Sequence, residues 1–161
     1  MIATTTRPAP DTPRRRWWAP SPRHHDRPAE VLAVLQQARG IVEAGWAQNR
    51  WTVPARAASV DGPVDGSVRA CVVGAVALAV RARDPHADLA VDTGPALAYV
   101  WDAVFGGRVA GRSAPHHVRV QRMRELARWN DEPGRTHDDV VSALDRAAAA
   151  VVGRVVDPAR A

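Results

Sequence analysis

The chain has 161 residues but no lysine, because all 22 of its basic residues are arginine. It has a single cysteine, Cys71, so no disulfide can form within the chain, whereas small secreted domains typically contain several paired cysteines. The longest apolar run, Val72–Val80, is far shorter than the roughly 20 residues that a membrane-spanning helix needs. The first residues contain no apolar core of a signal peptide. These absences predict a cytoplasmic protein without a membrane span.

The positive charge is concentrated near the N-terminus. Residues 1–28 carry six arginines and two aspartates, a balance of +4 out of a formal net charge of +5. The rest of the chain has 16 arginines and 15 acidic residues and is nearly neutral. A dedicated nucleic-acid-binding domain usually has a broad basic surface, and this balance does not provide one.

The first 27 residues combine five prolines with the basic and aromatic cluster Arg14–Trp18. Proline removes a backbone donor and interrupts helices and strands, and a polar, proline-rich composition is typical of disorder. We therefore predict a disordered basic arm at residues 1–27, a helical domain at residues 28–153 and a tail at residues 154–161.

The segment Cys71–Ala82 is apolar on almost every side, which predicts a helix that is buried on all sides. Gly74 within this helix indicates the close approach of a neighbouring backbone. Apolar residues that recur every three or four positions predict four more helices, at about residues 29–44, 95–105, 115–129 and 137–152. The predicted fold class is all-α: a compact single domain of five helices around a buried central helix, with an irregular segment or small hairpin at about residues 46–66.

Local signals predict where the helices begin and end. Ser67 is expected to cap the central helix, and Gly45 is expected to end the first helix in a left-handed conformation. Thr136 and Asp139 have the spacing of a capping box, in which each side chain bonds the backbone N–H of the other residue. Gly153 is expected to end the last helix.

Three motifs stand in order along the chain. They are Ala38-Arg39-x-Ile41-x-x-x-Gly45-Trp46-x-Gln48, then Ala70-Cys71-x-x-Gly74-Ala75, and then Trp129-Asn130-Asp131-x-Pro133-Gly134-Arg135-Thr136 with Asp139-Val140-Val141 and Leu144-Asp145-x-Ala147. Over about residues 30–150 the chain resembles a family of small actinobacterial and actinophage proteins catalogued as domain of unknown function 6197. The resemblance implies a cytoplasmic single domain from an actinobacterium or its phage, and it implies no catalytic role.

One hypothesis is a cysteine-dependent acyl-transfer or hydrolytic enzyme. Cys71 lies near a predicted helix N-terminus, where the helix dipole lowers a thiol pKa. His117, or its neighbour His116, is a candidate base, and Asn130 is a candidate orienting amide. The sequence around Cys71 has no protease signature, and a free cysteine is commonly a small core residue. The alternative, which we favour, is that Cys71 packs in the core.

The histidines do not predict a metal centre. His24-His25 and His116-His117 are adjacent pairs, and neighbouring residues on a helix do not face the same way. One cysteine cannot build a structural zinc site. We expect no metal and no cofactor.

An arginine-rich helix is the most basic part of the predicted domain. Residues 108–128 carry six arginines against Glu125 alone. Such a face is suited to phosphate contacts, although a solvated helix face in an arginine-biased chain is the simpler interpretation. The candidate polyanion-binding residues are Arg119, Arg122, Arg124 and Arg128.

The Trp-Asn-Asp turn has two interpretations. Asn130 and Asp131 are typical of a turn between helices, with Trp129 at the core edge and Arg135 paired with Asp131 or Glu132. Alternatively, Asn130 and Asp131 contact a ligand beside the indole ring. Taken together, the sequence predicts a non-catalytic binding or accessory module that contacts an unknown protein or a polyanion such as nucleic acid.

Overall fold

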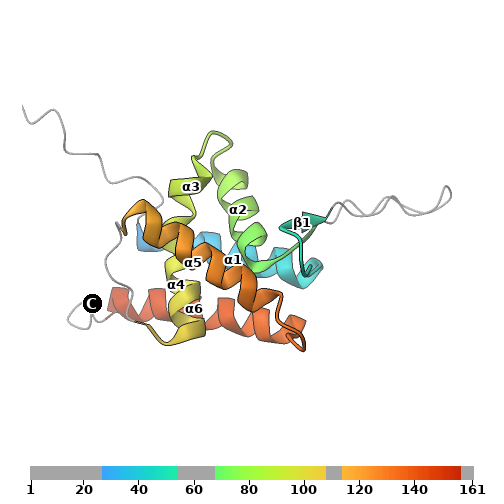
Figure 1. Ribbon diagram of the computed structural model, residues 1–161. Helices are drawn as coiled ribbons and strands as arrows, with labels where there is room; N and C mark the ends of the chain where they lie inside the picture. The colour runs from blue at the N-terminus through green and yellow to red at the C-terminus, as the bar shows by residue number, and fades with distance from the viewer. Residues whose placement is uncertain (1–26, 54–67, 108–113, 157–161) are drawn as a thin grey trace, which may run out of the picture.

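The computed structural model describes residues 27–53, 68–107 and 114–156. The predicted arm lies outside the described residues except for residue 27, as does most of the predicted insert. Of the predicted tail, residues 154–156 are described and belong to the last helix. The described part is all-α apart from one pair of short strands (Figure 1). The elements are α1 Pro28–Ala44, β1 Thr52–Val53, β2 Arg69–Ala70, α2 Val72–Arg83, α3 Leu89–Asp92, α4 Gly94–Phe105, α5 His116–Asn130 and α6 His137–Val156. This architecture confirms the predicted all-α domain with its five long helices; the one-turn helix α3 was not predicted.

Helix α1 is packed against both α6 and α2, and α4 joins α6 to α5. Figure 1 shows α6 along the lower edge of the domain. The buried side chains of α1 recur every three or four residues, as the apolar periodicity predicts. The core contains Leu35 of α1, Leu126 of α5 and Leu144 of α6, all fully buried. Three helices that are far apart in the sequence therefore share one apolar interior.

Helix α2 begins later than predicted. Its N-cap is Cys71, whose Sγ accepts a hydrogen bond from the backbone N–H of Gly74 at 3.4 Å. The prediction that Ser67, which lies outside the described residues, caps this helix is wrong, because the helix begins at Val72 and pairing with β1 holds Arg69 and Ala70 in an extended conformation. The first turns of α2 are buried, whereas its last turn, with Arg81 and Arg83, is exposed.

The two strands form a small antiparallel sheet that begins inside the predicted insert and ends beyond it. Thr52 faces Ala70, and Val53 faces Arg69. The main-chain oxygen of Trp51 accepts a hydrogen bond from Cys71 N at 3.1 Å. A Cβ atom on Gly74 would lie only 1.9 Å from that same oxygen. The close backbone approach predicted for Gly74 is therefore present, and its partner is Trp51.

The ends of α1 and α6 differ from the predictions because of contacts with other elements. Gly45 is extended (φ 177°) and not left-handed, because its carbonyl oxygen pairs with Ala70 N at 3.0 Å. Helix α6 continues past Gly153 to Val156, and the guanidinium group of Arg154 lies 5.0 Å from the centre of the Tyr99 ring on α4. Contacts with other elements thus decide both ends.

The capping box at the start of α6 is confirmed. The backbone N–H of Asp139 donates to Thr136 Oγ1 at 3.2 Å, and the backbone N–H of Thr136 donates to Asp139 Oδ2 at 2.9 Å. These bonds lower the pKa of the Asp139 carboxyl group, because they stabilise its charged form. The local signal was sufficient here because both partners lie within one turn.

We expect Gly74→Ala to lower the free energy of unfolding by about 2–4 kcal/mol, because the new methyl group overlaps a backbone oxygen that is held by the sheet. Gly40→Ala is the matched control, since Gly40 lies inside α1 with no atom within 4 Å of the added Cβ. We expect this control to raise stability by about 0.5–1 kcal/mol. Urea denaturation of both variants checks the prediction, and equal effects would contradict it.

Candidate functional site

The C-terminal half of α5 has a buried side and an open side. Its buried residues are Arg122, Leu126, Trp129 and Asn130. Arg124 and Arg128 are exposed and lie one turn apart on the other side. The buried side packs against the domain, and the other side faces solvent.

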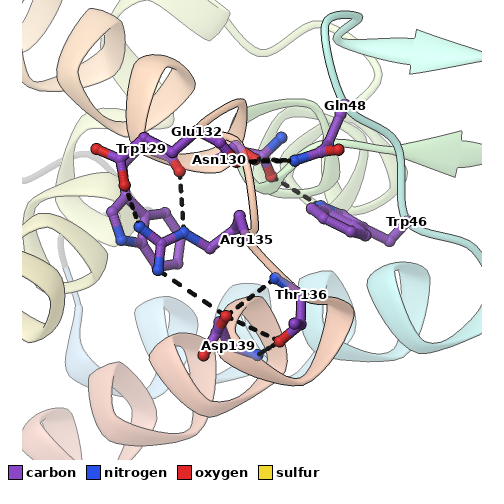
Figure 2. Close-up of polar contacts among 8 residues, drawn as sticks. All are labelled: Trp46, Gln48, Trp129, Asn130, Glu132, Arg135, Thr136 and Asp139. Carbon is purple, nitrogen blue, oxygen red and sulfur yellow. Dashed lines mark hydrogen bonds and ion pairs between the residues drawn. The ribbon is translucent and has the colours of Figure 1, made fainter.

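Asn130 is fully buried, and its side-chain amide makes four hydrogen bonds, of which Figure 2 shows the one with Trp46. Its Oδ1 accepts from Trp46 Nε1 at 2.9 Å and from the backbone N–H of Val72 at 3.2 Å. Its Nδ2 donates to the Ala47 carbonyl at 3.0 Å and to Asp131 Oδ1 at 2.8 Å. An amide has two donors and two acceptor positions, so no hydrogen-bonding capacity is left for a ligand.

The segment after α1 is bound along the end of α5 by further contacts. Gln48 Nε2 donates to the main-chain oxygens of Asn130 at 3.1 Å and Glu132 at 3.3 Å. The backbone N–H of Asn49, which has a positive φ of 59°, donates to Asp131 Oδ1 at 2.8 Å. Residues 46–49 are therefore held to α5 by both side-chain and backbone groups.

Trp129 and Arg135 close the other side of the turn. The guanidinium group of Arg135 lies 4.3 Å from the centre of the Trp129 ring, and its Nε donates to the Trp129 carbonyl at 3.0 Å. Arg135 also pairs with Glu132, one of its two predicted partners, and it lies 3.9 Å from Asp139. Figure 2 shows Arg135 between the indole ring and the start of α6. The structural interpretation of Trp129, Asn130 and Arg135 is the one that these contacts favour.

The residues of the hypothetical cysteine enzyme are not brought together as a set. Cys71 precedes Val72, whose N–H binds Asn130, so these two residues are near each other. His117 is exposed in the first turn of α5, thirteen residues before Asn130, and a helix rise of about 1.5 Å per residue separates the two by about 20 Å. Burial is the largest effect on the Cys71 thiol, and it raises the pKa. Backbone hydrogen bonds at the helix N-terminus lower the pKa by less than burial raises it, and the charge of nearby Asp131 raises it further. This is the environment of an unreactive thiol.

The four candidate polyanion-binding arginines divide into two pairs. Arg119 donates to the carbonyls of Ala90 at 3.3 Å and Ala114 at 2.8 Å. Arg122 is buried, and its guanidinium group lies 5.2 Å from the centre of the Trp101 ring. Both of these side chains are engaged within the domain. Only Arg124 and Arg128 are exposed.

A groove of about 490 Å³ lies on the open side of α5. This volume is within the usual range for small-ligand sites, roughly 300–1,000 Å³. The groove is lined by Asn49, Trp51, Met123, Arg124, Ala127, Arg128 and Asp131. Sequence reasoning treated Trp51 only as a strand residue and missed its place here, because the groove joins two segments more than 70 residues apart in the chain.

The described residues also form a smaller hollow and contain no candidate metal site. A second hollow, between α3, α4 and α5, has a volume of about 50 Å³ and is lined mainly by apolar side chains such as Leu89, Leu97 and Met123. In residues 27–53, 68–107 and 114–156, no three His, Cys, Asp or Glu side chains gather in a way that could hold a metal ion. No helix in these ranges is long and apolar enough to cross a membrane.

Comparison with known proteins gives one match. The model of a family of unknown function (DUF6197) matches residues 26–150. No curated protein and no solved structure matches the chain.

We expect Asn130→Ala to lower the free energy of unfolding by at least about 3 kcal/mol, because it leaves Trp46 Nε1, the Val72 N–H and the Ala47 carbonyl without their partner in a buried place. Ser142→Ala, at an exposed position of α6, is the control and should change stability by less than about 0.5 kcal/mol. Chemical denaturation provides the measurement. A loss below about 1 kcal/mol for Asn130→Ala would show that the network does not support the fold.

We expect iodoacetamide to alkylate Cys71 slowly in the native protein and rapidly after denaturation, since the residue is 2% exposed. The folded chain keeps the thiol proton to a higher pH than the unfolded chain does, so stability should fall as the pH rises above the unfolded thiol pKa of about 8.5. In Cys71→Ala this contribution to the pH dependence should disappear. Fast native labelling at pH 7 would contradict the assignment.

Proposed function

Because the chain belongs to the family of unknown function DUF6197, and this membership assigns no activity, we propose a function from the geometry of the described residues. The proposal is a non-catalytic binding module that takes a polyanion on the open side of α5. Arg124 and Arg128 hold the anion, and the groove beside them receives the rest of the ligand. The exposure of these two arginines, one helical turn apart beside a groove, is the observation that carries the proposal.

Two other surface arginines, Arg39 and Arg83, are paired with carboxylates. Arg39 pairs with Glu43 and Asp145, both at 2.6 Å, and Arg83 pairs with Glu30 at 2.7 Å. Within the described part of the chain, neither Arg124 nor Arg128 is within 4.0 Å of a carboxylate oxygen as an ion pair. Two guanidinium groups with unused donors are suited to phosphate or sulfate oxygens, which accept paired N–H bonds.

The acidic groups near the groove have other partners. One oxygen of Asp131 accepts from Asn49 N and from Asn130 Nδ2. Glu125 accepts from Trp101 Nε1 at 2.6 Å and from Gln121 Nε2 at 2.9 Å, and these bonds lower its pKa. Glu125 is therefore turned toward α4 rather than toward the groove. The local balance on the open side favours an anionic ligand.

The non-catalytic character of the proposal is supported by the buried thiol described above. The Cys71 thiol has a raised pKa, and no histidine is among the groups of the described residues that shift it. Asn130, the candidate orienting amide, is fully used in hydrogen bonds to the protein itself. These contacts argue against the cysteine-enzyme alternative.

We expect the full chain to bind a fluorescein-labelled heparin fragment at low ionic strength, with an affinity that falls steeply as salt is added. Arg124→Gln with Arg128→Gln should weaken this binding about tenfold or more at low salt, because it removes two of the charges that release counterions from the polyanion. Fluorescence anisotropy at several salt concentrations measures both effects.

The matched control is Arg81→Gln with Arg146→Gln, which removes the same net charge from exposed positions on α2 and α6. We expect it to leave the affinity within about twofold of the wild type. Absence of binding at low salt, or equal losses in the two double variants, would overturn the proposal.

A further inference from the structure

Trp51 is unusually exposed for its size and is held in a fixed place. Its side chain is 54% exposed, whereas Trp129 is 8% exposed. Its carbonyl oxygen is bonded to Cys71 N and lies directly against Gly74. The backbone of Trp51 is therefore held against the start of α2, and its side chain lines the groove without being buried.

Two arginines and two apolar side chains line the same groove as Trp51. Arg124 and Arg128 come from α5, and Met123 and Ala127 of the same helix lie beside them. An exposed aromatic ring that shares a groove with two guanidinium groups matches the two parts of an unpaired nucleotide. Bases stack on aromatic rings, and phosphates bind arginine.

We propose that the polyanion bound in this groove is a single-stranded nucleic acid, with a base stacked on Trp51 and its neighbouring phosphates on Arg124 and Arg128. This inference rests on the proposed function, because it assigns a ligand class to the same site. It makes Trp51 the residue that distinguishes nucleic acid from other polyanions.

The chemistry of the groove selects a single strand over the alternatives. In a duplex the faces of the bases are covered by their stacked neighbours, so they are not available to stack on the indole ring of Trp51. Sulfated polysaccharides and polyphosphate offer charges but no aromatic face, so they gain nothing from Trp51. Base stacking on an aromatic side chain adds affinity with little dependence on sequence.

The test uses the full chain with three labelled probes: a 15-residue oligothymidylate, an abasic oligonucleotide of equal length, and the heparin fragment. We expect the wild type to bind oligothymidylate about tenfold more tightly than the abasic strand at the same salt concentration. Trp51→Ala should bind the two strands equally, and it should bind heparin within about twofold of the wild type. Trp51→Phe keeps an aromatic ring and should retain most of the preference.

Phe105→Ala is the matched control, since Phe105 is an exposed aromatic residue (46%) at the end of α4 and does not line the groove. It should leave all three affinities unchanged. Because residues 14–18 of the full chain also combine arginines with two tryptophans, the binding of oligothymidylate is assigned to the groove only if Arg124→Gln with Arg128→Gln weakens it and Arg81→Gln with Arg146→Gln does not. This comparison does not depend on the folding of Trp51→Ala.

The possible failures separate the two proposals. Heparin binding that depends on Arg124 and Arg128, with equal affinity for the two strands, would overturn the single-strand inference and leave the proposed function standing. Equal losses for heparin and oligothymidylate in Trp51→Ala would also overturn it, because they would mean that Trp51 only shapes the groove. Absence of binding to all three probes would overturn both proposals.

Discussion

The buried amide of Asn130 is the contact on which the other parts of this structure depend. It joins the end of α5 to the segment after α1 and to the first backbone N–H of α2. A buried amide with all four hydrogen bonds made specifies one arrangement of these elements, because any other arrangement leaves polar groups unpaired in a dry interior. The three motifs of the family resemblance, which are far apart in the sequence, meet at this residue.

The same network also positions the groove. Asp131 binds the backbone of Asn49, and Cys71 and Gly74 hold the backbone of Trp51 two residues further on. The segment between α1 and β1 is therefore fixed against the end of α5, with the exposed ring of Trp51 facing the same groove as Arg124. The turn Trp129-Asn130-Asp131 supports this groove, and of its three residues Asp131 alone lines the groove.

Prediction from the sequence was good where the signals are local. The apolar repeat of α1 and the Thr136–Asp139 capping box involve partners within one or two turns, and both were recognised. It was poor where a distant strand decides the conformation. Gly45 and Ser67, the latter outside the described residues, were assigned as helix-end residues, but Cys71 caps α2, and the pairing of Gly45 with Ala70 places Gly45 in an extended form.

The sequence by itself determined the positions of the five long helices, that Cys71 suits a core position, and that α5 is the basic helix, because composition and periodicity are properties of short stretches. Only the tertiary structure decided which arginines are exposed, since the rings and carbonyls that engage Arg119 and Arg122 belong to other elements. It also decided the partner of Asn130, because Trp46 lies 84 positions away in the chain. Contacts over such distances depend on how the helices pack together, and no local pattern specifies them.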